Sequence, residues 1–404
     1  MAAMMATIDP LRAQELIGAH ITATPIESLP LQRCSGAVLR EDIYAERDQP
    51  PFDRVAMDGV AIACSATVGG QRSLTIQGTQ AAGEAPMTLA APGHCIEVMT
   101  GAVLPAGCNA VVPVERLQVT DGRVELEAGF DLAPWMFVHR RASDRRQGAL
   151  LLKSGSRLHA PEIAVAASAG MAQLRVSSQP TIMVISTGNE LVEPGAPIEA
   201  HQIRRSNTYA LAAALRERGL RRVDDDHLPD DAAVLREHLR RHLSSHQVLI
   251  LSGGVSMGRF DLVPKVLDEL GVHCILHGIS QRPGRPMWFG TASEGRSVFA
   301  LPGNPVSTLV CLIRYVVPAL CGAMGWAPVP ERVALSEPLQ WRAPLTGFMP
   351  VRLMQHADAR LWAAPCPTNG SGDFTSLALT DGFIELPCGP VELAKGYVAQ
   401  LYRW

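Results

Sequence analysis

Three glycine-containing turns contain residue types that could hold an anion. They are Ser186–Glu190 (STGNE), Ser252–Ser256 (SGGVS) and Leu301–Ser307 (LPGNPVS), and each adjoins or ends an apolar run. Glycine lets the backbone turn tightly and bring N–H groups close to a ligand, and serine and threonine hydroxyls add donors. One such turn alone is more often a plain strand-to-helix connection. Three favour a phosphate site, whose candidate binding residues are Ser186, Thr187, Gly188, Ser252, Gly253, Gly254, Ser256, Pro302, Gly303, Asn304 and Ser307.

A short basic loop, Arg282–Pro286 (RPGRP), is a sharper signal for the same chemistry. Its prolines stiffen the chain and Gly284 permits a turn, which keeps Arg282 and Arg285 close together. A guanidinium suits bidentate contacts with phosphate. The competing interpretation is a solvated basic loop.

Three carboxylates near the same turns could hold a divalent cation that bridges phosphates. They are Glu190, Asp231 and Asp261. Mg²⁺ typically takes one or two carboxylates together with phosphate oxygens and waters. Asp231 and Asp261 also stand at predicted helix starts, so helix capping competes with metal binding, and for Asp231 the two interpretations are about even.

A second group of potential ligands, His273, Cys274 and His277, lies on a strand-like run. Alternation along a strand would put the two histidines on one face and Cys274 on the other. A structural or pocket-lining role is therefore favoured over a metal centre. The chain also lacks the H-E-x-x-H, G-x-x-x-x-G-K-[ST] and G-x-S-x-G motifs.

Composition excludes several classes of protein. A net charge of −3 argues against a nucleic-acid or membrane-surface binder, so an anion site must be built locally. Nine scattered cysteines without a C-x-x-C pair indicate a reduced, cytoplasmic chain. Met1–Ile17 lacks the pattern of a signal peptide. The apolar run Val306–Trp326 contains Arg314 and Pro318, which favours a buried helix over a membrane span.

The elements that must position these residues point to a multidomain α/β protein. Between Thr181 and about Leu320, buried strands such as Thr181–Ser186, Val248–Leu251 and Val298–Leu301 alternate with helices, which predicts a mostly parallel, doubly wound sheet. Further helices are expected from Asp9 to about His20 and over Pro161–Ala169. Short strands and turns predict an inserted β-rich domain and a barrel-like β domain at the C-terminus. The expected domains are 1–50 with 140–178 (a helical, elongated linking domain), 51–139 (β-rich), 179–326 (α/β) and 327–404 (C-terminal β).

Taken in order along the chain, the motifs resemble one family, the molybdopterin molybdenumtransferases or molybdenum insertases, to which the C-terminal domain of gephyrin is related. Any one motif is weak, but the ordered set is specific. Besides the turns and the arginine loop, the set comprises Pro50–Asp53, Ala56–Gly59, Met99–Ala102, Leu104–Gly107, Ser206–Asn207 and, more loosely, Ser371–Gly372 with Ser376–Ala378.

The resemblance implies a reaction and an assembly. Adenylated molybdopterin and molybdate are the substrates, AMP is released with the help of Mg²⁺, and molybdenum is placed on the dithiolene sulfurs. It implies an elongated homodimer whose pocket lies between the α/β domain of one subunit and the β-rich domain of the other. The resemblance adds Ser206 and Asn207 to the binding residues and gives the catalytic set as Asp58, Thr100, Glu190 and Asp231. Molybdoenzymes are the implied downstream partners.

Several positions depart from the family pattern. Arg205 replaces an acidic residue and could face the pterin or nucleotide, Ala142-Ser143-Asp144 replaces Gly-Glu-Asp, and Gln247 replaces an aspartate. Arg282 and Arg285 replace lysines and keep the charge. These departures leave open a paralogue that carries or scaffolds the cofactor without inserting metal. A third alternative is an adenylyltransferase acting on molybdopterin, against which the additional β domains argue.

Overall fold

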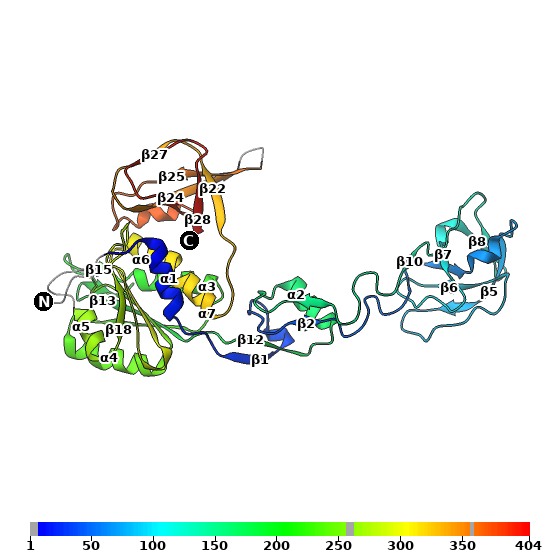
Figure 1. The fold of residues 1–404 in the computed structure, drawn as a ribbon, viewed down its shortest axis with the longest axis horizontal. Coiled ribbons are helices and arrows are strands. Elements are labelled where there is room, and N and C mark those ends of the chain that lie inside the picture. The colour runs from blue at the N-terminus through cyan, green and yellow to red at the C-terminus, as the bar shows by residue number, and fades with distance from the viewer. Residues whose placement is uncertain (1–6, 256–261, 356–358) are drawn as a thin grey trace.

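The computed structural model describes residues 7–255, 262–355 and 359–404. The molecule is elongated: an α/β unit and a C-terminal barrel form one end, a β-rich unit forms the other, and a thin linking unit joins them (Figure 1). The multidomain α/β architecture expected from the sequence is confirmed. Ser256 and Asp261 lie outside the described residues.

The α/β unit contains a six-stranded sheet in the order β16-β13-β17-β21-β20-β18. The first four strands are parallel, as predicted, and β20 pairs antiparallel with both β21 and the edge strand β18. Apolar clusters cover both faces of the sheet, as a doubly wound fold requires. The strands are β13 (Ile182–Thr187), β16 (Val223–Leu228), β17 (Val248–Ser252), β18 (His273–His277), β20 (Trp288–Thr291) and β21 (Ser297–Leu301), and the helices are α3 (Asn207–Glu217), α4 (Ala232–Ser245), α5 (Leu262–Glu269), α6 (Pro305–Cys311) and α7 (Val317–Ala323).

The helix α1 (Pro10–His20) begins as the sequence predicts, because the side chain of Asp9 accepts hydrogen bonds from the backbone N–H groups of Leu11 and Arg12, both at 3.0 Å. Its position differs from the prediction. We expected residues 1–50 in the linking domain, but Ala13 and Ile17 are buried in the main core of the α/β unit, where α1 packs beside α7 (Figure 1). An apolar helix face packs wherever it finds a complementary apolar surface, which sequence order does not specify.

The run Pro305–Ala323 is one continuous helical segment with a π-helical turn at Leu312–Val316. By length and composition it could cross a membrane, but most of it is buried inside the protein. The segment is a core helix, in agreement with the sequence interpretation.

The linking unit is formed by segments from both sides of the β-rich unit. Strand β1 (Ile26–Pro30) pairs with β12 (Gln173–Ser177), and β2 (Ile43–Tyr44) pairs with β11 (Leu150–Leu152). Helix α2 (Ala160–Ser168) covers them, close to its predicted bounds. Two strand pairs, each formed by segments far apart in sequence, therefore hold the linking unit together.

The β-rich unit is a six-stranded sheet in the order β7-β4-β6-β5-β9-β8. Its strands are short and separated by turns, as the sequence predicts. They are β4 (Gly59–Ile62), β5 (Ser73–Gln80), β6 (His94–Val98), β7 (Ala110–Pro113), β8 (Leu117–Thr120) and β9 (Arg123–Leu126), and the entry to the unit is the short pair β3 (Arg54–Val55) and β10 (Val138–His139).

The C-terminal unit is a closed five-stranded barrel, since β24 pairs with both β25 and β26 in the order β24-β25-β22-β28-β26. Its strands are β22 (Glu331–Leu335), β24 (Thr346–Gln355), β25 (Leu361–Pro365), β26 (Gly382–Leu386) and β28 (Val398–Arg403), with β19 (Gln281–Arg282) added beside β24 and a separate pair of β23 (Leu339–Trp341) and β27 (Val391–Leu393).

A buried arginine joins the barrel to the α/β unit. Nε of Arg314 lies 2.9 Å from Oε2 of Glu385, and its Nη1 donates to Oε1 of Gln14 at 2.5 Å. Its guanidinium lies over the rings of Tyr315 and Tyr402. One side chain thus connects the π-helical turn, α1 and the barrel.

Replacing Arg314 by Met is expected to destabilise the protein by about 3 kcal/mol, because removing one partner of a buried ion pair leaves the other charge uncompensated. Calorimetric unfolding measures the loss. The double variant Arg314→Met/Glu385→Gln should recover part of it. Arg12→Met, which breaks the exposed Arg12–Glu15 pair, should cost no more than about 0.5 kcal/mol. Equal losses in Arg314→Met and Arg12→Met would contradict this role.

Candidate active site

A cavity of about 840 Å³ opens where the parallel strands of the α/β unit end. This edge is where ligands bind in open α/β sheets. The three predicted turns and the start of α3 all contribute to it. From the predicted set the lining residues are Ser186, Thr187, Gly188, Glu190, Ser206, Asn207, Ser252, Gly253, Gly254, Pro302, Gly303 and Asn304.

Asn207 holds the turns together. Its Nδ2 donates to Oγ of Ser252 and to the carbonyl oxygen of Gly303, both at 2.8 Å. Oγ of Ser252 also lies 3.5 Å from Oγ1 of Thr308, whose hydroxyl donates to the carbonyl of Pro302. The start of α3 and two of the turns therefore form one hydrogen-bonded floor.

The glycine turns approach each other too closely for side chains. A Cβ on Gly253, whose φ is +103°, would lie 2.8 Å from both the carbonyl oxygen and Oγ1 of Thr187. The Thr187 hydroxyl is buried and has no hydrogen-bond partner among the described residues. A buried polar group without a partner is costly, so this hydroxyl is suited to a ligand at the floor of the cavity.

Two helices begin at the cavity without a side-chain cap. Ser206 precedes α3 and Asn304 precedes α6, and neither side chain makes a capping hydrogen bond. The Nδ2 of Asn304 instead donates to Oγ of Ser371 at 2.8 Å. The first N–H groups of a helix together with its dipole attract anions, which suits the predicted phosphate chemistry.

The acidic residues of the cavity differ in part from the prediction. Glu190 is exposed and lines the cavity, as expected. Asp231 does not line it: its Oδ1 accepts from the N–H groups of Ala233 and Val234, both at 2.9 Å, and caps α4. The neighbouring Asp230 lines the cavity instead. The turn before α4 directs one aspartate to the helix and the other to the cavity, which residue type alone does not distinguish.

Arg205 lines the cavity but does not present a free charge to it. Its guanidinium is buried and forms ion pairs with Asp225 and with Glu193, the latter at 3.1 Å. It also lies under the ring of Tyr209. Arg205 thus stands where it could face the pterin or nucleotide, as the sequence suggests, but two carboxylates from neighbouring segments neutralise its charge.

The arginine loop belongs to a second cavity of about 640 Å³ between the α/β unit and the barrel. Arg282, Arg285 and Ser307 line it, together with Arg342 from the barrel side. Within the part of the chain that the structure describes, neither Arg282 nor Arg285 pairs with a carboxylate. Three guanidiniums next to polar backbone make this the basic part of the site.

The two cavities adjoin. Both are lined by Pro286, Pro302 and Asn304, so the turn that follows β21 forms a wall shared by the two. The barrel contributes Gly372 and Phe374 to the first cavity, and the Phe374 ring is 43% exposed. Sequence reasoning missed Asp230, Arg342 and Phe374. Only Phe374 had a signal, since it follows the Ser371–Gly372 motif.

Comparison with known proteins places the chain in a family. Three family models match it in succession: the MoeA N-terminal region (domain I and II) over residues 8–170, a probable molybdopterin binding domain over 183–321, and the MoeA C-terminal region (domain IV) over 332–404. A relative from Synechocystis sp., named molybdopterin molybdenumtransferase, is 40% identical over 98% of this chain and 100% of its own. The chain belongs to the molybdopterin molybdenumtransferase family.

Other members of the molybdopterin molybdenumtransferase family support the same conclusion. Molybdopterin molybdenumtransferase 2 of Mycobacterium tuberculosis is 33% identical over 97% of this chain and 98% of its own. The crystal structure of the molybdopterin biosynthesis MoeA protein from Pyrococcus horikosii superposes with a TM-score of 0.82 at 30% identity, over 98% of this chain and 99% of that one. The likeness covers all the units described above.

The family's other two expected catalytic residues, Asp58 and Thr100, lie in the β-rich unit. Oδ1 of Asp58 accepts from the backbone N–H and the hydroxyl of Thr100, at 2.6 and 2.7 Å. These hydrogen bonds lower the pKa of Asp58, which keeps the carboxylate ionised. Both residues are exposed, and within one chain their unit lies at the opposite end of the molecule from the cavities (Figure 1).

Two other departures from the molybdopterin molybdenumtransferase pattern lie away from the cavities. Gln247 connects strands, since its Oε1 accepts from the backbone N–H of Thr181 at 3.1 Å. Ser143 is exposed beside Asp144 in the loop that leaves the β-rich unit. The preceding Ala142, where the family usually has glycine, has a φ of +61°. Neither Gln247 nor Ser143 lines either cavity.

The histidine and cysteine run of β18 forms no ligand group with the residues that the structure describes. His273 and Cys274 are both exposed, because a bulge between Cys274 and Leu276 interrupts the alternation expected of a regular strand. His277 is half-buried. Among the described residues, the potential ligands that do converge are Asp226, His238 and His242.

Proposed function

We propose that this protein inserts molybdenum from molybdate into adenylated molybdopterin and releases AMP. The observation that carries the proposal is the pair of adjoining cavities, one formed by the glycine turns and carboxylates and the other by arginines. A ligand with a phosphoric anhydride in its middle and a ring system at each end has that shape and charge. Full-length relatives named for this activity support it.

The basic cavity is the proposed anion subsite. Arg282, Arg285 and Arg342 would neutralise phosphate oxygens, while backbone N–H groups at the start of α3 add donors in the first cavity. The exposed ring of Phe374 offers a face for stacking a heterocycle. Cleavage of a phosphoric anhydride depends mainly on such positioning and charge neutralisation.

Mg²⁺ is proposed to bind at the carboxylates of the first cavity. Glu190 and Asp230 offer hard oxygen ligands there, and the unpartnered Thr187 hydroxyl lies in the same cavity. Asp231 keeps its capping role. When bound, the ion would supply positive charge to the phosphates. The Glu190 carboxylate would place its negative charge next to the part of the ligand that reacts.

Asp58 and Thr100 are proposed to act across a homodimer. They are too far from their own chain's cavities to take part there, so they would complete the pocket of the partner subunit. The exposed Asp58 carboxylate, kept ionised by Thr100, would accept hydrogen bonds from an incoming water and so orient it. Cytoplasmic location and delivery of the product to molybdoenzymes complete the proposal.

A cofactor carrier is the second candidate. Arg205 and Ser143 favour it, but the pairing of Arg205 with Asp225 and Glu193 removes the argument from Arg205. The two functions are separated by incubating the protein with adenylated molybdopterin, with and without molybdate and Mg²⁺. The proposal predicts AMP release that requires molybdate and is promoted by Mg²⁺. Tight binding with no AMP release under any condition would identify a carrier. ATP consumption in a separate incubation with molybdopterin and ATP would identify an adenylyltransferase.

Substituting Gly253 by Ala is expected to weaken ligand binding. The added methyl group would collide with Thr187 and strain a backbone whose φ is +103°. Overpacking of this kind costs about 1–3 kcal/mol, or roughly five- to 150-fold in Kd. Calorimetric titration with adenylated molybdopterin measures it. Gly18→Ala is the matched control, since Gly18 lies in α1 with open space at its Cβ position. Equal Kd values for the two variants would contradict the inference that the glycine turns at the floor of the cavity are too closely packed for a side chain.

A further inference from the structure

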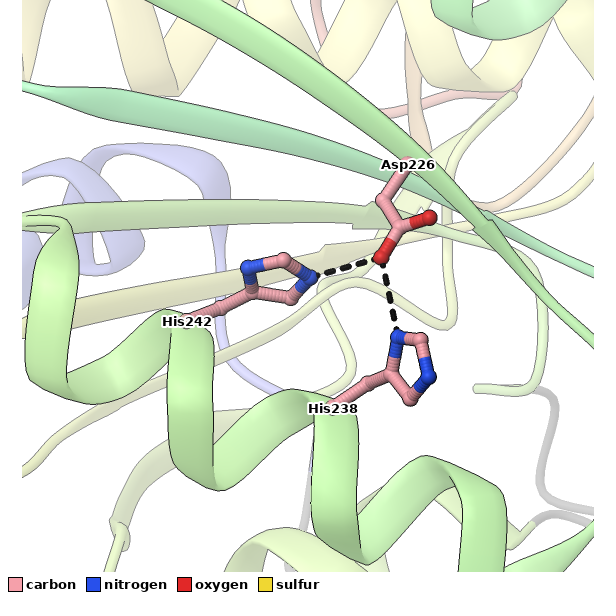
Figure 2. A group of neighbouring side chains, drawn as sticks. All are labelled: Asp226, His238 and His242. Atoms are coloured by element: carbon pink, nitrogen blue, oxygen red, sulfur yellow. Dashed lines mark hydrogen bonds and ion pairs between the residues drawn. The ribbon is translucent and has the colours of Figure 1, made fainter.

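A group of metal-ligating side chains lies outside both cavities. His238 and His242 on α4 face Asp226 on β16 (Figure 2). Oδ2 of Asp226 lies 3.1 Å from Nδ1 of His238 and 2.7 Å from Nε2 of His242. One potential ligand atom from each of the three residues lies within 4.8 Å of the others. None of the three lines a described cavity.

The sequence builds this group from two regular periods. His238 and His242 are four residues apart on α4 and therefore share one helix face, and His246 is the C-cap that follows the helix. Asp224 and Asp226 are two apart on β16 and share the strand face that this helix covers. The intervening Asp225 points the other way, to Arg205. Two imidazoles and one carboxylate form the ligand set of many zinc centres with one open position.

The hydrogen bonds within the group cannot all be made at once. Nδ1 of His238 lies 3.1 Å from Oδ2 of Asp226 and also 3.1 Å from Nη2 of Arg241. The carboxylate needs a donor there and the guanidinium needs an acceptor, but a ring nitrogen provides only one of these. A cation between Nδ1 and Oδ2 would bind both lone pairs, and the exposed Arg241 would turn to solvent.

Other features of the group suit a cation. Tetrahedral ligands at zinc distances lie about 3.3 Å apart, and Oδ2 of Asp226 lies 3.1 Å from Nδ1 of His238 and 2.7 Å from Nε2 of His242. Oδ1 of Asp226 accepts from the backbone N–H of His227 at 2.8 Å, which fixes the carboxylate. His238 and Asp226 are part-exposed and leave an entry path.

The charged side chains around the group favour the binding of a divalent cation. Asp224 lies beside it and pairs with Nε2 of His246 at 3.2 Å. Arg241 is the opposing positive charge, and it is exposed enough to move away. Asp226 and Asp224 together offset the two charges of a divalent ion.

We propose that Asp226, His238 and His242 bind a divalent transition-metal ion, with zinc as the best match, and that this ion fastens α4 to β16. The site is distinct from the proposed Mg²⁺ ligands Glu190 and Asp230. It also adjoins the active site through one residue, because Nδ1 of His227 contacts Oγ of Ser186 at 3.1 Å, and Ser186 lines the first cavity.

The test uses metal-stripped full-length protein titrated with Zn²⁺, and with Co²⁺ as an optical probe. We expect His238→Ala and Asp226→Asn each to lose one equivalent of Zn²⁺, or to bind it at least about tenfold more weakly, and to lose the Co²⁺ visible bands. His238→Ala keeps the Asp226–His242 contact, so its fold is expected to persist. His201→Ala removes an exposed histidine paired with Glu199 and should behave as the parent.

Zinc stoichiometry and Co²⁺ bands unchanged in both His238→Ala and Asp226→Asn would overturn the proposal. So would a parent protein that binds no zinc. The parent should also show a higher Tm with zinc than without it, and this increase should vanish in His238→Ala. Because the readouts are metal content, spectrum and Tm, they do not depend on whether the protein inserts molybdenum.

Discussion

Glu190→Ala is expected to reduce AMP release by about a hundredfold or more, while the fold stays intact. The side chain is exposed on a turn at the end of β13, so its removal costs little stability. Its loss removes one of the two carboxylates that line the first cavity among the described residues. Groups that stabilise charge at a reacting centre typically contribute factors of about 10²–10³. Single-turnover AMP release and a thermal unfolding curve measure the two effects.

The matched control for Glu190 is Glu199→Ala. Glu199 is an exposed glutamate nine positions along the same stretch, outside both cavities. It should release AMP at the parent rate. If Glu190→Ala also kept the parent rate, the carboxylate assignment in the first cavity would fail. The substitution Asp230→Ala should give a smaller loss if Glu190 alone contacts the reacting group.

The second large effect concerns the shared pocket. Asp58→Ala should also abolish turnover, although Asp58 lies at the far end of its own chain. A heterodimer with Asp58→Ala in one subunit and Glu190→Ala in the other should regain about half of the parent activity. In such a dimer one pocket carries both substitutions and the other carries neither, as two-fold symmetry requires.

The heterodimer is obtained by co-expressing the two chains with different affinity tags and purifying through both. An inactive heterodimer would mean that Asp58 and Glu190 act in one chain, against the shared pocket. Failure to recover any doubly tagged species would show a monomer and lead to the same conclusion. Asp131→Ala, which alters another exposed aspartate of the β-rich unit, serves as the control and should release AMP normally.

The sequence predicted the turns of the site better than its side-chain directions. Glycine and serine at the ends of apolar runs have strong local causes, so the convergence of Gly188, Gly253 and Gly303 could be predicted from strand order alone. Whether Asp230 or Asp231 faces the cavity depends on the backbone of one turn. That choice is made by the hydrogen bonds that cap α4, which residue type does not reveal.

The other features that could not be predicted from the sequence depend on packing between segments that are far apart in the chain. The placement of α1 against α7 and the neutralisation of Arg205 by Asp225 both involve segments that meet only in the folded chain. The division of the site into two cavities depends on the barrel, which contributes Arg342 and Phe374. By contrast, the histidines of α4 and the aspartates of β16 had a visible period, and their meeting required only that the helix cover that strand.

We propose above all that the release of AMP and the insertion of molybdenum are one coupled reaction. The most direct test is a single turnover with adenylated molybdopterin, excess molybdate and Mg²⁺, in which AMP and pterin-bound molybdenum are both quantified. We expect about one molybdenum per AMP, and negligible AMP when molybdate is omitted. AMP released at the same rate without molybdate, with no molybdenum on the pterin, would contradict it.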